Sequence, residues 1–342
     1  MQTPAVQIPS TNEKGTLGIL HLCRYWSINL FKRNGNIPVD SYIEEWSLDN
    51  AMLNMLGLGL EQTITFLYRE NPSFDEFEKW ILKLNGGKLS QEKVNRFNQI
   101  ASGEIAPDQS AGSIKNVLSP DELASWNENG YLVLPAVISR EDCERTIRLI
   151  CDFIGINQLD PATWYNAHPA RQGIMVQLFQ HEWMEKNRQN AYIRSVYEEL
   201  WGRKDLIVST ARAGFNPPET ATWSFPGPRI HWDVSLKLPI PFGLQGILYL
   251  ADTAADQGAF SFVPGFHNKI ESWLQSLPPG TNPRTTDFEK LGVKPIAANA
   301  GDFIIWHHAL PHGSSPNKSN KPRFVQYFNW APPDMEFREE WV

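Results

Sequence analysis

The chain has 342 residues, of which 42% are hydrophobic and 20% charged, and its formal net charge is −7. This composition excludes a largely disordered chain, and the acidic balance excludes a general electrostatic attraction for nucleic acid or an anionic membrane. The three cysteines form no CxxC pair. Neither a basic-then-apolar leader nor an apolar run of membrane-spanning length occurs. These features favour a cytoplasmic protein that uses neither disulfides nor a membrane anchor.

Helical spacing of apolar residues dominates the first third of the chain. Residues 1–15 are polar and are predicted to form a flexible N-terminus. A helical region is predicted over 16–100, and within it Ser73 and Glu76 form a capping box, in which each side chain satisfies the other's free backbone N–H. Residues 101–117 are small, polar and without periodicity, so we interpret them as a linker.

Residues 118–342 are predicted to form a mainly β domain with helices, an α+β fold. A helix starts at Ser119 and a strand covers 131–135, followed by a helix near 140–153. The apolar period then changes from 3.6 to 2. The segments that read as strands are LIVSTARAGF, RIHWDVSL, LQGILYLAD, AFSFVP, GDFIIWHH and RFVQYFNW. Six or more short strands with turn signals between them favour a sandwich or jelly roll.

The first chemical motif is His231-Trp232-Asp233, inside one of these expected strands. Alternate side chains of a strand share a face, so His231 and Asp233 would point together while Trp232 turns away. Such a pair can supply two metal ligands. It fits equally well a surface strand that carries an ion pair.

A third ligand would have to come from residues 301–330, which contain His307, His308 and His312. Two neutral imidazoles and one carboxylate on one face of an octahedral iron(II) leave three positions open, as oxygenases require. The residues alone leave all three histidines as candidates. Arg323 begins the last predicted strand, and an inward guanidinium there could bind a carboxylate through two parallel charge-assisted bonds.

The segments RIHWDV, DQGAFSFVPGFH, and GDF followed by HGSSPNKSNKPR resemble the phytanoyl-CoA dioxygenase family of iron(II)/2-oxoglutarate oxygenases. The resemblance covers roughly residues 118–332 and implies a double-stranded β-helix, a jelly-roll barrel. In the family pattern an arginine follows the third metal-binding histidine by eleven residues, which here selects His312. The resemblance implies that His231, Asp233 and His312 bind iron(II), and that Ser314 and Arg323 bind 2-oxoglutarate.

This sequence departs from the family pattern near the co-substrate. Many relatives place tryptophan on the strand after the metal-binding pair, where this chain has Ile247. Gln245 and Gln177 are candidate replacement contacts to 2-oxoglutarate, although each also fits an ordinary strand residue. Arg212 could meet an anionic substrate or form an ion pair at the barrel wall.

The resemblance implies that iron(II), 2-oxoglutarate and O2 oxidise a C–H bond of a small molecule, with release of succinate and carbon dioxide. Hydroxylation of a free or carrier-bound compound of specialised metabolism is the expected reaction. The alternatives are a non-catalytic jelly roll that binds a ligand or senses a metal, and a metal-dependent hydrolase. The region 16–100 could be a lid, a homodimer contact, a partner-docking site or a packing appendage.

Overall fold

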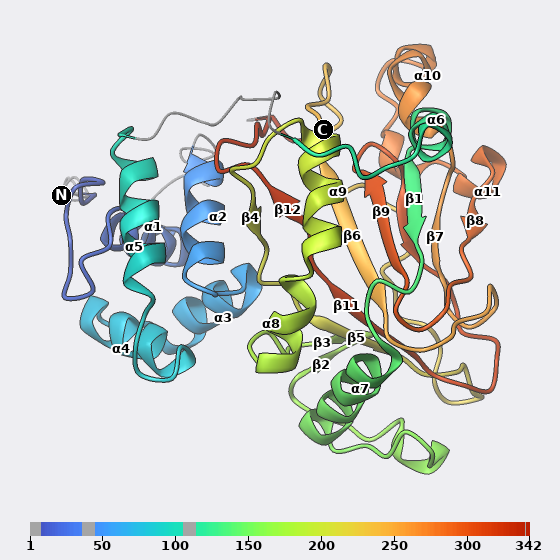
Figure 1. Cartoon of the computed structure of the whole chain (residues 1–342), viewed down its shortest axis with the longest axis horizontal. Coiled ribbons are helices and arrows are strands. Elements are labelled where there is room, and N and C mark those ends of the chain that lie inside the picture. The colour runs from blue at the N-terminus through green and yellow to red at the C-terminus, as the bar shows by residue number, and fades with distance from the viewer. Residues whose placement is uncertain (1–7, 36–44, 105–113, 339) are drawn as a thin grey trace. The chain divides into compact units, whose positions relative to one another are not determined.

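The computed structural model describes residues 8–35, 45–104, 114–338 and 340–342 (Figure 1). The chain divides into two compact units. The first comprises the described parts of Met1–Gln109, Arg203–Thr210 and Ala331–Glu339, and the second those of Ser110–Gly202, Ala211–Trp330 and Glu340–Val342. The start of the expected flexible N-terminus and most of the expected linker lie outside the described residues. The linker expected at 101–117 therefore stays a prediction. Two later segments, Arg203–Thr210 and Ala331–Glu339, also belong to the first unit.

The first unit is helical, as the apolar spacing predicts. Its helices are α1 (Leu22–Arg33), α2 (Trp46–Met55), α3 (Leu60–Glu70), α4 (Phe74–Leu84) and α5 (Gln91–Ala101), and the short β4 (Ile207–Val208) also belongs to it. The capping box at the start of α4 is confirmed, because the Ser73 hydroxyl accepts from Glu76 N and the Glu76 carboxylate accepts from Ser73 N. Fully buried side chains such as Met52, Phe77 and Phe97 form the core of this unit.

The second unit holds the remaining strands. In chain order its elements are α6 (Pro120–Asn129), β1 (Tyr131–Leu134), α7 (Arg140–Ile154), β2 (Arg171–Gln172), β3 (Met175–Val176), α8 (Glu182–Arg188), α9 (Ala191–Trp201), β5 (Ala213–Asn216), β6 (Leu244–Tyr249), β7 (Phe260–Phe262), α10 (Ile270–Ser276), α11 (Phe288–Leu291), β8 (Lys294–Pro295), β9 (Phe303–His307), β10 (His312–Ser314) and β11 (Arg323–Tyr327), with β12 (Trp330–Ala331) at its edge. Within the part of the chain that the structure describes, no helix combines the length and the apolar character needed to cross a membrane.

Two antiparallel sheets make up the barrel. Among the described residues, seven strands form the larger sheet, in the order β1-β9-β6-β11-β5-β3-β2, and three form the smaller one, in the order β10-β7-β8. Strands distant in sequence are neighbours, as where β6 pairs with both β9 and β11. This is the double-stranded β-helix expected from the sequence, with helices added in an α+β arrangement.

The two faces of the larger sheet have different partners. Ile247, Ile304 and Val325 belong to one buried cluster inside the barrel. On the opposite face, the Gln326 side chain accepts a hydrogen bond from Asn187 Nδ2 and donates one to the carbonyl of Met184 in α8. Because strand side chains alternate, Arg323 and Tyr327 share the inner face with Val325. The Arg323 side chain therefore points into the barrel, as expected from the sequence.

One predicted strand is wrong. The segment RIHWDVSL forms no named strand; His231 alone makes an isolated antiparallel bridge with His312, and irregular backbone follows it. The alternation of apolar residues there has another cause. Trp232 is 2% exposed and packs against Phe266, Trp273 and Phe288, as part of the same buried cluster as Ile247 and Val325.

Candidate active site

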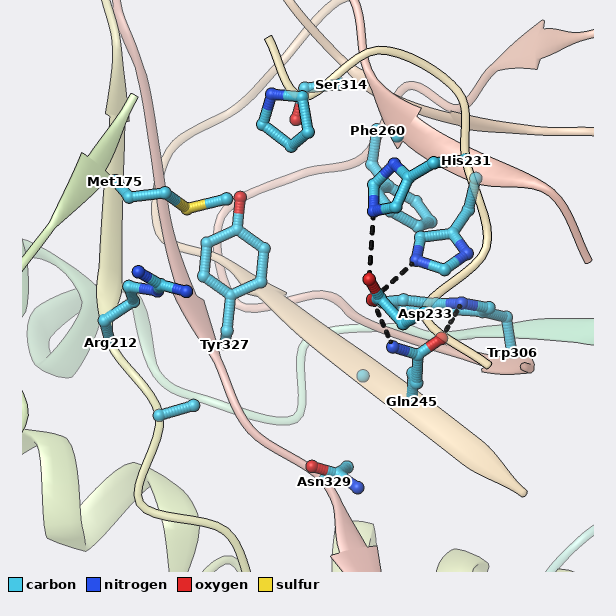
Figure 2. A pocket seen from close by; sticks show the side chains of 15 residues that line it. Met175, Arg212, His231, Asp233, Gln245, Phe260, Trp306, Ser314, Tyr327 and Asn329 are labelled. Carbon is cyan, nitrogen blue, oxygen red and sulfur yellow. Dashed lines mark hydrogen bonds and ion pairs between the residues drawn. The ribbon is translucent and has the colours of Figure 1, made fainter. Parts of the chain in front are cut away.

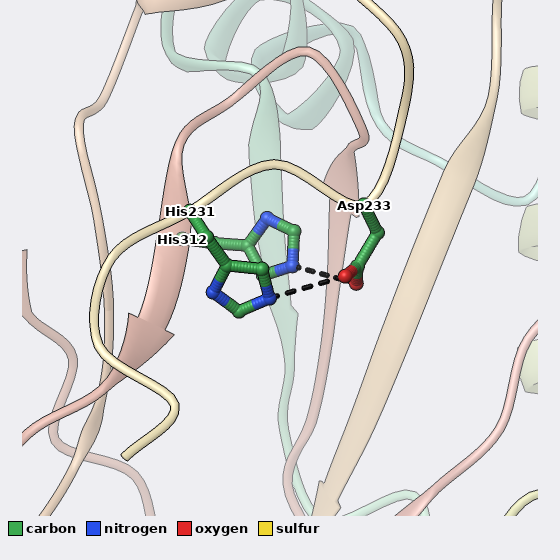
Figure 3. A group of neighbouring side chains, drawn as sticks. All are labelled: His231, Asp233 and His312. Atoms are coloured by element: carbon green, nitrogen blue, oxygen red, sulfur yellow. Dashed lines mark hydrogen bonds and ion pairs between the residues drawn. The ribbon is translucent and has the colours of Figure 1, made fainter. Parts of the chain in front are cut away.

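Three side chains from two distant segments meet inside the barrel. The Nε2 atoms of His231 and His312 lie 3.1 Å and 3.2 Å from the two carboxylate oxygens of Asp233, and Figure 3 shows both rings turned toward that carboxylate. One candidate ligand atom from each residue lies within 4.8 Å of the other two. The bridge between His231 and His312, with N···O distances of 2.8 Å and 2.9 Å, fixes the separation of the two segments.

The outer ring nitrogens define the tautomers. His231 Nδ1 lies 2.6 Å from the carbonyl oxygen of Arg229, and His312 Nδ1 lies 3.0 Å from that of Leu310. A carbonyl oxygen only accepts, so each Nδ1 carries a proton, and Nε2 is the ring nitrogen that points at Asp233. Each Nε2 needs either a proton or a metal cation between it and the carboxylate oxygen that it faces. A metal cation meets that requirement, and the donor set fits iron(II).

The pKa values of these groups reflect the same clustering. Burial alone would lower the pKa of His231, but the hydrogen bond and the charge of Asp233 outweigh it and raise that pKa above its usual value. Burial acts in the opposite direction on Asp233. There the hydrogen bonds and charges of His231 and His312 prevail and hold the pKa of the carboxyl far below its ordinary range. Asp233 is therefore an anion at neutral pH, as a metal ligand must be.

Gln245 on β6 supports the carboxylate from the side. Its Nε2 donates to Asp233 Oδ2 at 2.8 Å, and its Oε1 accepts from the Trp306 indole at 3.2 Å (Figure 2). The indole thereby fixes which way the amide points. Outer contacts of this kind orient a metal ligand and commonly change metal affinity.

A second polar group lies in the barrel around Arg323, which is completely buried. Its Nη2 donates to Ser314 Oγ at 3.0 Å and to Tyr327 Oη at 3.4 Å, whereas Nε and Nη1 have no hydrogen-bond partner in the described structure. None of the described carboxylates forms an ion pair with this guanidinium. A buried cation with two unused donors is costly unless a ligand supplies the acceptors. A ligand carboxylate fits this requirement.

The metal-binding candidates border one cavity of about 330 Å³, together with Ser314 and Tyr327, the two hydrogen-bond partners of Arg323. Figure 2 shows Met175, Arg212 and Tyr327 on one side and the metal-binding candidates on the other, with Asn329 at the bottom of the view. The residues that line the cavity are Met175, Ala211, Arg212, Pro228, His231, Asp233, Gln245, Gly246, Phe260, Trp306, His312, Gly313, Ser314, Tyr327 and Asn329. The cavity is therefore mixed in character, with polar groups set among aromatic and aliphatic walls.

Comparison with known proteins shows the family to which the chain belongs. The family model for phytanoyl-CoA dioxygenase (PhyH) matches residues 126–325. The chain belongs to the phytanoyl-CoA dioxygenase family. A Dictyostelium discoideum protein that carries the same family name is 25% identical over 254 residues, which cover 59% of this chain and 72% of that protein. This oxygenase accordingly depends on iron(II), 2-oxoglutarate and O2.

Several solved structures are similar to this oxygenase at low sequence identity. The 2-oxoglutarate-dependent epimerase SnoN from nogalamycin biosynthesis is 17% identical, with a TM-score of 0.46 over 62% of this chain and 82% of that one. EctD from S. alaskensis is 15% identical, with a TM-score of 0.46 over 68% and 85%. HygX from Streptomyces hygroscopicus, solved with nickel and 2-oxoglutarate bound, is 15% identical, with a TM-score of 0.43 over 63% and 88%.

The predicted site residues of the oxygenase do not all reach the cavity. His231, Asp233, His312, Ser314 and Gln245 line it, and Arg323 donates to the lining residue Ser314. Gln177 does not line it. Its amide Nε2 donates to Gln172 Oε1 at 3.0 Å, because the chain leaves β3 at this point and the side chain turns to the β2–β3 hairpin. We therefore leave Gln177 out of the co-substrate contacts proposed below.

Two contributors escaped the sequence interpretation. Tyr327 brings its hydroxyl to Arg323, and its position four residues further along the same strand was the available signal. Trp306 orients Gln245, which no sequence pattern shows, because the two residues lie 61 positions apart in the chain. Ile247 is fully buried on the inner face of β6.

Replacing Gln245 with leucine is expected to weaken metal binding by about 10- to 100-fold, because Asp233 loses the contact that orients it. Titration of the metal-free protein with iron(II) measures the effect. The matched control is Gln326→Leu on β11, a buried glutamine that faces away from the cavity. It should lower stability and leave the metal affinity unchanged. Equal metal affinity in the Gln245 variant and the wild type would contradict the role.

His307 and His308 stay outside the ligand set. The His307 ring contacts Phe242 and His267, and His308 Nε2 donates to the carbonyl of Pro241. Burial, reinforced by the neighbouring histidines, lowers the pKa of His307 to about 3. Burial likewise lowers the pKa of His308 to about 4. Both rings are therefore neutral packing residues at physiological pH.

These two low pKa values predict acid destabilisation. In the unfolded chain these histidines bind protons below about pH 6.5, whereas in the folded protein they stay neutral down to about pH 4. Their contribution to the stability of the folded protein is therefore complete above about pH 6.5 and is lost as the pH falls. At pH 5 each histidine should lower the free energy of unfolding by about 1–2 kcal/mol relative to pH 7. Urea unfolding at both pH values measures the loss. In His307→Phe the loss in the free energy of unfolding between pH 7 and pH 5 should be smaller by about 1–2 kcal/mol, the contribution of one histidine. An unchanged loss would be evidence against this assignment.

Proposed function

We propose that this oxygenase holds iron(II) with His231, Asp233 and His312, and holds the distal carboxylate of 2-oxoglutarate with Arg323 and Ser314. The observation that carries the proposal is the convergence of three ligand atoms within 4.8 Å in the same barrel as a fully buried guanidinium with two unused donors. A metal alone would leave Arg323 without a purpose. A carboxylate-binding site alone would give no role to the two imidazole Nε2 atoms that converge on Asp233.

The protein groups have separate tasks in this proposal. The carbonyls of Arg229 and Leu310 hold the two imidazoles in the tautomer that presents Nε2. Gln245 holds the Asp233 carboxylate. Arg323 gives the co-substrate its orientation, since a guanidinium binds a carboxylate in a fixed planar geometry. The Tyr327 hydroxyl, 3.4 Å from Arg323 Nη2, is a further candidate contact to that carboxylate.

The metal and 2-oxoglutarate, when bound, supply the oxidation of a C–H bond, with succinate and carbon dioxide as by-products. The protein positions one C–H bond of the substrate and keeps bulk water away from it. Aromatic walls such as Phe260 and Trp306 suit that second task. Hydroxylation is the reaction we propose, since it needs no further group from the protein.

The substrate we propose is a small organic molecule of specialised metabolism, or the reacting end of a carrier-bound one. The cavity of about 330 Å³ must hold the co-substrate as well, which leaves room for a small group. Arg212 and Asn329 line this cavity and are candidates for contacting polar groups of the substrate. The cytoplasmic location and a homodimer formed through the helical region stay predictions from the sequence.

Anaerobic titration tests the assignment. Purified protein is titrated with iron(II) and 2-oxoglutarate while the weak visible charge-transfer band of their chelate is followed. We expect the band to appear only when both are present, with one iron per chain. Zinc should compete for the site without producing the band. Absence of the band in folded wild-type protein would refute the proposed roles of the triad and Arg323.

A further inference from the structure

The backbone that carries His231 and Asp233 lacks the hydrogen-bonding partners that a strand would give it. After the bridge at His231 no strand forms until β6 begins at Leu244, and Figure 3 shows both residues on irregular backbone. Buried backbone groups nevertheless need partners, and metal ligands need a fixed position. Between residues 232 and 237, other groups must therefore supply the hydrogen bonds that a neighbouring strand would provide.

One guanidinium takes up the carbonyls on both sides of Asp233. Arg284 Nη1 donates to the carbonyl of Trp232 at 2.8 Å, and its Nη2 donates to the carbonyl of Val234 at 2.7 Å. The arginine is itself held in place, because the Asn282 side chain accepts from Arg284 N at 2.9 Å. Asp233 is thus bracketed by two charge-assisted bonds from a single planar group.

Residues 340–342 complete this support, and we call them the strap. Arg284 Nε and Nη2 donate to the main-chain oxygen of Val342 at 3.1 Å and 2.7 Å, and that oxygen also accepts from Leu236 N. The buried Ser235 hydroxyl donates to the carbonyl of Glu340 at 2.6 Å and accepts from Val342 N. The Arg284 guanidinium lies 4.7 Å from the ring centre of Trp341. The strap and Arg284 therefore bind one another as well as the irregular segment.

We propose that Arg284 and the strap are positioning elements that hold the His231–Asp233 segment in its metal-binding conformation. The inference rests on the proposed metal triad. Arg284 touches neither the cavity nor a ligand atom, so it acts through the backbone on either side of Asp233 and is not a catalytic residue. Nothing in the sequence pattern indicates this role, because Arg284 lies 51 positions after Asp233, in the short 3-10 helix Pro283–Thr285.

The test compares iron(II) affinity with co-substrate affinity in Arg284→Gln. With saturating 2-oxoglutarate, the iron(II) concentration that gives half of the chelate band should rise by about 10- to 100-fold, as for other outer contacts of metal ligands. With saturating iron(II), the 2-oxoglutarate concentration that gives half of the band should not change, because Arg323 is untouched. A merely structural role would lower the thermal unfolding midpoint and leave both concentrations unchanged, and this result would overturn the inference.

Two further variants keep the test decisive. Ser235→Ala removes the hydroxyl that binds the strap but keeps Arg284, and it should weaken iron(II) binding by a smaller factor than Arg284→Gln does. If Arg284→Gln does not fold, Ser235→Ala decides the test. Unchanged iron(II) affinity in that variant refutes the inference. Arg140→Gln is the matched control, since it removes an exposed arginine paired with Asp252 and should behave as wild type. A wild type without a chelate band would instead refute the proposed function, so the two failures are distinguishable.

Discussion

His312→Ala is expected to abolish the iron(II)/2-oxoglutarate chelate band and all oxygenase activity. His312 is 3% exposed, and its tautomer is set by the carbonyl of Leu310. Loss of a direct ligand should weaken iron(II) binding by more than the roughly 100-fold seen when outer contacts are lost. Anaerobic titration of the purified variant measures this directly. The fold should survive, because the bridge to His231 uses main-chain atoms only.

The control for this result is a neighbouring histidine that the geometry keeps away from the triad. His307→Phe retains an aromatic ring beside Phe242 and His267 and should bind iron(II) as the wild type does. If His307→Phe lost the band while His312→Ala kept it, the choice of the third ligand would be wrong. Retention of the band in both variants would show that neither histidine binds the metal.

The sequence predicted the elements whose local signals and tertiary environment agree. The capping boxes at Ser73 and Ser119 start helices where expected, and Gly130 ends α6 in the left-handed conformation. The strand prediction is wrong at RIHWDVSL. Apolar and polar residues alternate there and Trp232 packs inward, but beyond the single bridge at His231 the backbone pairs with no neighbouring strand in the described structure. Periodicity reports which side chains are buried, and it does not report where the backbone finds its hydrogen bonds.

The candidate site was predictable to the extent that it is local in sequence. The pair His231 and Asp233, and the register between His312 and Arg323, can be read directly from short motifs. The supporting contacts cannot. Gln245 is oriented by an indole from another strand, and Arg284 binds carbonyls some 50 residues earlier. Such contacts depend on the path of the chain in three dimensions, which a single sequence does not specify.

Arg323→Met is expected to weaken 2-oxoglutarate binding by about 100-fold or more, since breaking a buried charge pair costs about 3–5 kcal/mol. Iron(II) binding should be retained, because the variant leaves His231, Asp233 and His312 untouched. Without ligands the same change should raise the free energy of unfolding by about 1–3 kcal/mol, because it removes a buried cation with two unused donors. Isothermal titration and urea unfolding measure the two effects.

Arg188→Met provides the matched control, because Arg188 is also almost completely buried, yet both of its terminal nitrogens have protein partners and only Nε lacks one among the described residues. Its Nη2 donates to the carbonyls of Phe179 and Ala211, each at 2.7 Å. Its loss should lower stability and leave 2-oxoglutarate affinity unchanged. Adding 2-oxoglutarate at 100 times its Kd to the iron(II)-loaded proteins should stabilise the wild type and Arg188→Met by about 2.7 kcal/mol, but not Arg323→Met. A gain in stability for Arg323→Met together with a loss for Arg188→Met would support a ligand-binding role for Arg323. A loss of stability in both variants would identify Arg323 as an ordinary structural residue.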